Sequence, residues 1–250
     1  MSKSFKNYEI LKSNERGVAD HGWLKSKHSF SFASYFNPKQ LGFSTLLVIN
    51  EDKVASNRGF GTHPHKNMEI FSYVLSGSLA HKDSMNNGTT IKPGDVQLMS
   101  AGTGVLHSEF NPSPNEEVHF LQIWIHPFEQ GGQPSYQQRN FPNETKRGKL
   151  KLIISPTGEK DSLVIKQNAK VYAGLFDGNE KASIKQDLSR AYYVHVVKGS
   201  IDINDVSLEA GDAIKIHSHL LKSEKEENLE ILFHNAKNAE ILVFDLNPTY

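Results

Sequence analysis

Residues 73–83, YVLSGSLAHKD, have a counterpart in the second half of the chain, where residues 195–205 read HVVKGSIDIND. A Gly-Asp turn follows each segment, within IKPGDVQLM (91–99) and LEAGDAIKI (208–216). A strand, a glycine turn, a second strand and a Gly-Asp turn into a third strand form a hairpin unit. Because this unit occurs twice, the sequence predicts two halves of similar architecture.

Other short segments rich in β-branched or aromatic residues end at Gly, Pro, Asn or Asp, as strands do. They are FSTLLVINED (43–52), IFSYVLSG (70–77), VQLMSAG (96–102), VHFLQIWIHP (118–127), KLKLIISP (149–156), YYVHVVKGSIDIN (192–204), GDAIKIHSH (211–219) and EILVFDLNP (240–248). No segment shows a long apolar period of 3.6 residues, the pattern of an amphipathic helix. The sequence therefore predicts an all-β sandwich or barrel.

The length of 250 residues suits one large domain or two small ones, at roughly 100–200 residues per domain. Residues 129–149, EQGGQPSYQQRNFPNETKRGK, are polar and contain Gly, Pro, Gln and Asn. Such a composition is typical of a linker or a long loop. We therefore expect an N-terminal domain over residues 1–132 and a C-terminal domain over residues 133–250.

The composition excludes several classes of protein. Lys and Arg together number 28 and Asp and Glu number 28, so the net charge is zero and no basic footprint for nucleic acid is present. The absence of cysteine excludes disulfides, thiolate metal sites and a cysteine nucleophile. The N-terminus lacks the apolar segment of a signal peptide, and no apolar run is long enough to cross a membrane. We expect a cytoplasmic protein that binds neither membranes nor nucleic acid.

Two pairs of potential metal ligands occur in the first half. GTHPHKNME (61–69) places His63 and His65 two residues apart, and AGTGVLHSEFN (101–111) does the same for His107 and Glu109. Residues i and i+2 of a strand point to the same face, so each pair can point into a barrel. Imidazole is a common ligand of transition metals. Three imidazoles and a carboxylate would leave open positions on an octahedral ion for O2 or a chelating substrate.

The order of H-x-H, Y-V-x-x-G, P-G-D and A-G-x-G-x-x-H-S-E resembles that of the pirin family of bicupin proteins. RGVADHGWLKSKHSFSFASYFNP (16–38) and MSAGTGVLHSEFNPS (99–113) also look like the pirin-type bacterial quercetin 2,3-dioxygenases. The resemblance covers most of residues 14–136 and continues more weakly to the C-terminus. It implies two tandem cupin barrels, with one metal ion in the N-terminal barrel held at the positions of His63, His65, His107 and Glu109.

The resemblance implies two alternative functions. The first is a metal-dependent dioxygenase that cleaves flavonols such as quercetin with O2, with Glu109 as the catalytic base that takes the proton of the substrate's hydroxyl. The second is a non-enzymatic regulatory protein that senses metal or redox state and binds a protein partner. We expect a monomer and one divalent ion, iron before copper, manganese, nickel, cobalt or zinc, although zinc would not support the reaction with O2.

The second repeat serves as an internal control for the ligand set. Counted from the repeat glycines, the positions of His63, His65 and His107 are taken in the second half by Lys185, Asp187 and Glu224. The C-terminal barrel is therefore expected to lack the metal site. His217 and His219 form a further H-x-H at a different place in the repeat, and we expect them to be strand-end histidines without a metal.

The remaining candidates are expected to be structural. Glu69 is interpreted as a salt-bridge partner or a group behind the ligands rather than as a ligand. Structural roles are expected for seven further histidines, of which the first two lie in a segment that could border the pocket and the other five are expected to have their hydrogen bonds satisfied. Ordinary core packing is favoured for four aromatic residues that could instead line a pocket. These are His21, His28, His81, His119, His126, His195 and His234, and Phe30, Phe32, Phe60 and Trp124.

Overall fold

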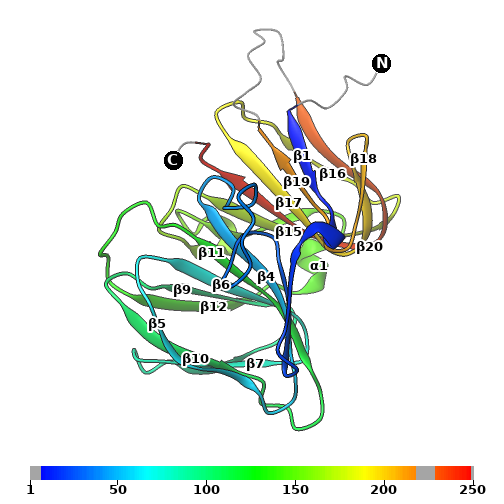
Figure 1. Ribbon diagram of the computed structural model, residues 1–250. Helices are drawn as coiled ribbons and strands as arrows, with labels where there is room; N and C mark the ends of the chain where they lie inside the picture. The colour runs from blue at the N-terminus through cyan, green and yellow to red at the C-terminus, as the bar shows by residue number, and fades with distance from the viewer. Residues whose placement is uncertain (1–6, 218–228, 249–250) are drawn as a thin grey trace.

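The structure is a computed structural model that describes residues 7–217 and 229–248. Strands dominate it, and they form three sheets that build two stacked halves (Figure 1). β-branched and aromatic residues fit a pleated and half-buried surface, which explains why the segments rich in them became strands. The prediction of an all-β protein made of two tandem barrels is confirmed.

The N-terminal half consists of a seven-stranded sheet that faces a four-stranded sheet (Figure 1). In spatial order the larger sheet contains β12 (Ser135–Asn140), β9 (Asp95–Ser100), β6 (Glu69–Ser76), β11 (Val118–Ile125), β4 (Leu46–Val54), β3 (Leu24–His28) and β2 (Gly17–Asp20). The smaller sheet contains β5 (Gly59–His65), β10 (Val105–Phe110), β7 (Leu79–Asp83) and β8 (Gly88–Ile91). The space between these two sheets is the interior of the N-terminal barrel.

The C-terminal half is a nine-stranded sheet that folds around its own core. Its main path is β1 (Tyr8–Leu11), β19 (Ala213–Ile216), β17 (Ala191–Ile203), β20 (Glu230–Leu246), β15 (Lys170–Gly178), β13 (Leu150–Ser155) and β14 (Leu163–Val164), with β16 (Ala182–Lys185) beside β20 and β18 (Val206–Glu209) beside β17. Three short helical turns connect strands: η1 (Ser13–Glu15), α1 (Asn143–Lys146) and η2 (Glu159–Asp161). Among the described residues, no helix has the length and apolar character needed to span a membrane.

Alternation along each strand divides the side chains between two cores. On β6, Phe71 is buried in the core between the two halves, where it contacts Phe244 of β20 with ring centroids 6.3 Å apart. Ile70 and Val74 belong instead to the interior of the N-terminal barrel, and Ser72 shares their face. The two halves thus pack through an apolar layer, and the barrel interior of the first half remains available for a site.

Gly77 connects two different sheets and Gly199 lies inside β17, so the prediction of a hairpin at these glycines is wrong. The strands on either side of Gly77, β6 and β7, lie in different sheets and do not pair with each other. Gly77 has a φ of +74° and Gly199 a φ of +69°, which glycine adopts without strain. A Cβ at Gly199 would lie 2.2 Å from the backbone oxygen of Lys237. Both glycines therefore allow a positive φ at a point where another strand passes close by.

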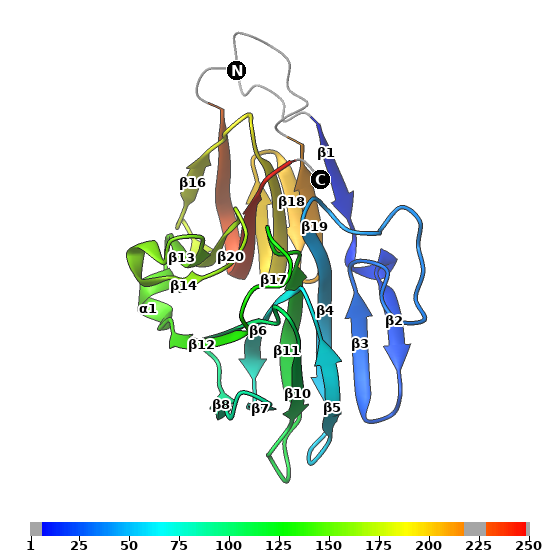
Figure 2. The ribbon, with the colours of Figure 1, turned by 90° about the vertical axis from the view of Figure 1, so that its left-hand side faces the viewer.

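β12 and β1 each pair with a sheet of the half opposite to the one that their place in the sequence suggests. The pairing of β12 corrects a prediction. Residues 129–149 are not simply a linker, since β12 pairs with β9 in the N-terminal sheet over six residues, Ser135 to Asn140. At the other end of the chain, β1 pairs with β19 of the C-terminal sheet (Figure 2). The division into residues 1–132 and 133–250 stays a prediction.

Candidate metal centre

Three imidazole rings meet inside the N-terminal barrel. His63 and His65 come from β5, and His107 comes from the neighbouring strand β10, where it is the direct cross-strand partner of His63. The ring centroids lie 4.9 Å apart for His63 and His65, 4.5 Å for His63 and His107, and 4.8 Å for His65 and His107. Their potential ligand atoms all lie within 4.8 Å of one another. The alternation predicted for the H-x-H motif thus gives a compact group.

The donor atoms of this group fit a metal ion. Nε2 of His63 and Nε2 of His107 lie 3.0 Å apart. Two nitrogen ligands at about 2.1 Å from an ion and at right angles to each other would stand about 3.0 Å apart. Nε2 of His65 is buried and has no hydrogen-bond partner among the described residues. The Nδ1 of His63 donates to the carbonyl oxygen of Gly61 at 2.8 Å, which leaves Nε2 of His63 as the ligand atom.

Electrostatics keeps two of these rings neutral. Burial, reinforced by His63, lowers the pKa of His65 to about 4. Burial, together with the neighbouring histidines, lowers the pKa of His107 to about 3. A neutral imidazole has a lone pair available for a metal, whereas an imidazolium has none. The rings are therefore in the form that binds a metal at neutral pH.

Glu109 approaches His107 from the inner side of the barrel. Its side chain is 2% exposed, and its carboxylate accepts hydrogen bonds from Ser72 Oγ at 3.2 Å and from Gln122 Nε2 at 2.6 Å. The register of β10 against β5 shifts between His107 and Glu109, which is the sign of a β-bulge. The carboxylate groups with His107 and His81 rather than with the three-histidine group. Burial raises the pKa of Glu109 to about 7.

A belt of polar side chains lies on the barrel face of the larger sheet. Three of its members are Ser72 of β6, Gln97 of β9 and Gln122 of β11, all of them buried. The belt lies between two apolar clusters, one around Phe120 and the other around Met99. Because buried polar groups are costly unless they have partners, a polar belt at this position favours a functional cavity over ordinary core packing.

Aromatic residues cover the side of the centre at His65. Trp124 of β11 packs edge-to-face on His65 with ring centroids 4.9 Å apart, and Phe32 packs on Trp124 at 5.4 Å. Nε1 of Trp124 is buried without a hydrogen-bond partner among the described residues. Phe30 and Phe60 are ordinary packing residues, as expected: Phe30 is in the core between the halves, and Phe60 packs on an apolar cluster.

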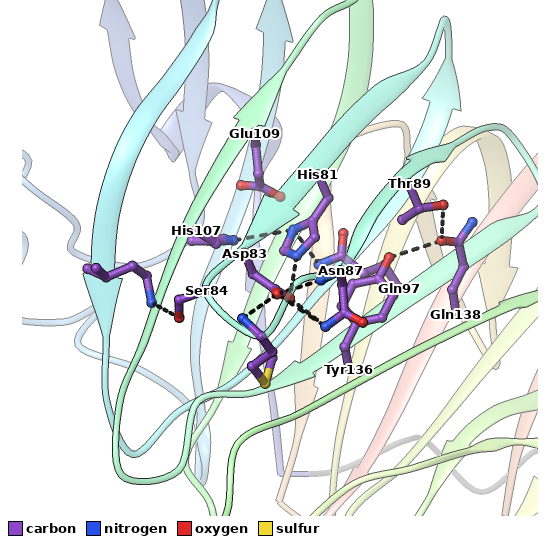
Figure 3. Close-up of polar contacts among 12 residues, drawn as sticks. His81, Asp83, Ser84, Asn87, Thr89, Gln97, His107, Glu109, Tyr136 and Gln138 are labelled. Atoms are coloured by element: carbon purple, nitrogen blue, oxygen red, sulfur yellow. Dashed lines mark hydrogen bonds and ion pairs between the residues drawn. The ribbon is translucent and has the colours of Figure 1, made fainter.

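His81 and Asp83 lie beside this centre, although His81 is expected from the sequence to be a structural histidine. Figure 3 shows His81 on β7 pointing at His107, with Nδ1 of one ring 3.5 Å from Nδ1 of the other. Nε2 of His81 lies 3.0 Å from a carboxylate oxygen of Asp83. The pair is again at i and i+2, in LAHKD, which is the pattern that revealed the other two pairs.

Most of the other candidates have structural roles. Glu69 accepts hydrogen bonds from Ser100 Oγ at 2.8 Å and from the backbone N–H of Lys166 at 3.2 Å, so it links the two halves. His195 is an exception: it is buried, and neither ring nitrogen has a partner among the described residues, so the expectation of a satisfied histidine is wrong there.

The C-terminal half provides no comparable cluster in the part of the chain that the structure describes. Lys185 lies on β16 and Asp187 caps the following turn through Ser189. The ring of His217 packs edge-to-face on Phe43, with centroids 5.2 Å apart. Glu224 and His219 lie outside the described residues.

One cavity of about 510 Å³ lies at the junction of the two halves and not at the histidines. Residues that follow β11, β13 and β14 line it, among them Phe128, Ile165 and Lys166. None of the residues proposed as metal ligands is part of its wall.

Comparison with known proteins points to one family. Residues 11–125 match the family model described as Pirin, and residues 152–246 match that of the Quercetinase C-terminal cupin domain. Quercetin 2,3-dioxygenase of Escherichia coli K12 is 43% identical over 239 residues, covering 96% of this chain and 98% of its own length. The crystal structure of the bacterial pirin YhhW from Escherichia coli in complex with nickel(II) superposes with a TM-score of 0.88 at 42% identity, covering 97% of this chain and 100% of that one.

Proposed function

This chain belongs to the pirin family, and from that premise we propose that it is a metal-dependent dioxygenase that cleaves flavonols such as quercetin with O2. The observation that carries the proposal is the group of His63, His65 and His107, with the buried carboxylate of Glu109 beside it. The relatives named as quercetin 2,3-dioxygenases support the choice of reaction.

We assign the metal ligands to the three Nε2 atoms of His63, His65 and His107 and to the carboxylate of Glu109. A divalent transition metal bound there would supply a Lewis acid for the substrate's enolic hydroxyl and an electron-transfer partner for O2. Iron is our first choice, and the nitrogen and oxygen donors also suit copper, manganese, nickel and cobalt. The nickel(II) complex of the Escherichia coli pirin supports the binding of a metal ion by this chain.

Glu109 is proposed as the base that removes the proton of the substrate's hydroxyl. Its carboxylate is shielded from water and is held by the side chains of Ser72 and Gln122, so its position is fixed before the substrate binds. A carboxylate that accepts two hydrogen bonds can exchange these contacts for a bond to a proton or to the metal ion. General bases of this kind contribute roughly 10²–10⁴-fold to a rate.

The aromatic wall formed by Trp124 and Phe32 supports a flat, apolar substrate. Aromatic rings prefer edge-to-face or offset contacts with other rings, and Trp124 already makes such a contact with His65. Its buried Nε1–H has no acceptor among the described residues, so a carbonyl or hydroxyl oxygen of a ligand could accept from it. A flavonol has both a planar ring system and such oxygens.

Oxygen uptake by protein of known metal content tests the proposal. The protein would be loaded in turn with Fe(II), Cu(II), Mn(II), Ni(II) and Zn(II), and oxygen consumption measured with and without quercetin. We expect uptake with at least one redox-capable metal, none with zinc, and none in His63→Ala. His217→Ala is the matched control, because it removes an imidazole from the C-terminal half, and it should behave like the wild type.

The alternative is a regulatory protein that binds metal and a protein partner. Metal bound in stoichiometric amount without any oxygen uptake would contradict the dioxygenase proposal and favour this alternative. The monomeric state and the cytoplasmic location stay predictions.

A further inference from the structure

The carboxylate of Asp83 is unusually well held for a residue at the end of a strand. It accepts hydrogen bonds from the backbone N–H of Met85 at 2.8 Å, from the backbone N–H of Asn87 at 3.0 Å and from Asn87 Nδ2 at 2.9 Å. Figure 3 shows these contacts converging on Asp83 beneath the ring of His81. Because every one of these partners is a donor, Asp83 is a fixed acceptor.

This acceptor determines where His81 carries its proton. Nε2 of His81 lies 3.0 Å from Asp83, and a carboxylate can only accept, so Nε2 carries the hydrogen. Nδ1 of the neutral ring then has the lone pair. Gln97 Nε2, a donor, lies 3.3 Å from that Nδ1 and fits the same assignment. The ring also stacks on Tyr136, with centroids 4.9 Å apart, which fixes its plane.

The lone pair of His81 in turn faces His107. The two Nδ1 atoms lie 3.5 Å apart, and this contact is favourable when Nδ1 of His107 carries a hydrogen and donates it to the lone pair of His81, which Gln97 Nε2 also faces at 3.3 Å. The other nitrogen of His107, Nε2, then has the lone pair and faces His63 at 3.0 Å. The direction of the hydrogen bonds is thus the same along the whole path from His107 through His81 to Asp83.

The second repeat of the chain supports a link between His81 and the metal ligands. Four residues after Gly77 the N-terminal repeat has His81, and four residues after Gly199 the C-terminal repeat has Ile203. Ile203 is fully buried in an apolar cluster of the barrel that lacks the ligand set. The barrel that lacks the ligand set therefore also lacks a counterpart of His81.

We propose that His81, held by Asp83, is a positioning residue: it accepts the Nδ1–H of His107 and so presents Nε2 of His107 to the metal. The proposal rests on the metal centre described under the proposed function. Hydrogen-bonded groups behind a ligand typically account for roughly 10–100-fold in metal affinity when they are removed. The cluster His81, His107 and Glu109 also has the spacing of a ligand group, so direct ligation by His81 is the outcome to be distinguished.

The experiment compares wild-type protein with His81→Leu, which removes the acceptor, and His81→Asn, whose side-chain oxygen can replace Nδ1. Nickel(II) affinity would be measured by competition with a chelator. Pulsed electron paramagnetic resonance of the Cu(II)-loaded proteins would count the bound imidazoles and report on their remote nitrogens. Circular dichroism would confirm that each variant is folded.

We expect three bound imidazoles in all three proteins, a nickel affinity lowered roughly 10–100-fold in His81→Leu, and recovery of most of that loss in His81→Asn. The quadrupole coupling of one remote nitrogen, that of His107, should change in His81→Leu. Unchanged affinity and coupling in a folded His81→Leu would overturn the proposal, as would a fourth imidazole that disappears with His81. Failure of the wild type itself to bind metal would instead refute the proposed function.

Discussion

His63 and His107 are direct cross-strand partners, and their Nε2 atoms lie 3.0 Å apart although 44 residues separate them in the chain. Pairing of β5, which carries His63 and His65, with β10, which carries His107, therefore brings all three imidazoles together. Neither histidine depends on the C-terminal half for its position. The metal centre is therefore a property of the N-terminal barrel.

Replacing a ligand should remove the metal and leave the fold. His63→Ala and His107→Ala each delete one nitrogen of the group, so the metal content of purified protein should fall to near background. His63 is only partly buried, and its loss leaves little empty space. Elemental analysis and thermal unfolding check both parts of the prediction, with His217→Ala as the control that retains full metal content. Wild-type metal content in His63→Ala would refute the ligand assignment.

Glu109→Gln should separate binding from chemistry. The amide has nearly the shape of the carboxylate, so packing against Ser72 and Gln122 is largely kept, but one hydrogen-bond acceptor becomes a donor that faces Gln122. We expect weaker metal binding and a turnover number lower by roughly 10²–10⁴-fold at saturating metal. Oxygen uptake at fixed metal occupancy measures the second effect. Turnover within a factor of two of the wild type would show that Glu109 is not the base.

His195 should make the protein sensitive to acid. Burial lowers the pKa of His195 from 6.5 to about 3, with nearby Arg16 acting in the same direction against the weaker influence of Glu51 and Asp212. Between these two pH values the unfolded chain binds more protons than the folded one, so stability rises with pH. The contribution of the neutral ring is complete above the unfolded pKa and is lost as the pH falls through that window.

Urea unfolding at about pH 7 and about pH 5 tests the predicted loss of stability in acid. His195→Leu removes the titrating group from an apolar layer, so its free energy of unfolding should fall less between the two pH values than that of the wild type. His21→Ala, which removes an exposed histidine, should keep the wild-type difference. Equal pH dependence in His195→Leu and the wild type would contradict the prediction.

Gly199→Ala and Gly178→Ala form a matched pair of variants that tests how closely another strand approaches Gly199. Both have positive φ values, +69° and +57°, so alanine at either position costs about 1–2 kcal/mol of backbone strain. Only at Gly199 would the new Cβ meet the backbone oxygens of Lys237 and Asn238, at 2.2 and 2.3 Å. Gly199→Ala should therefore destabilise the protein clearly more than Gly178→Ala in thermal unfolding. Similar losses would mean that the strand crossing is not tight.

Local patterns were enough to predict many of the strands and to single out His63, His65 and His107, whose role as metal ligands is implied by the family resemblance. The β-branched segments around Ile49, Phe71 and Ile123 became strands because their alternation buries one apolar face against the other half. The same alternation puts His63 and His65 on one face without any knowledge of the partner strand. These features depend on residues that are close in sequence, which is why the sequence reveals them.

Features that depend on distant pairing were missed. A Cβ at Gly77 would lie 2.9 Å from Cα of Val118, and nothing in residues 73–83 predicts that this strand passes so close. The segment of β12 is predicted as a linker because an edge strand can be polar, and its composition then resembles that of a loop. His81 lies beside His107 because β7 pairs with β10. The ring nitrogens of His195 lack a hydrogen-bond partner among the described residues, and this too depends on the tertiary packing around the ring.

A dioxygenase transfers both atoms of O2 to its product, so the origin of the product's oxygen atoms reports on the reaction itself. Metal-loaded protein would be given quercetin under ¹⁸O2, and the ring-opened product analysed by mass spectrometry, with His63→Ala protein treated identically. We predict a product that carries two ¹⁸O atoms per molecule and that is absent with His63→Ala. Unchanged quercetin, or a product with a single ¹⁸O atom, would contradict the assignment of this chain as a dioxygenase.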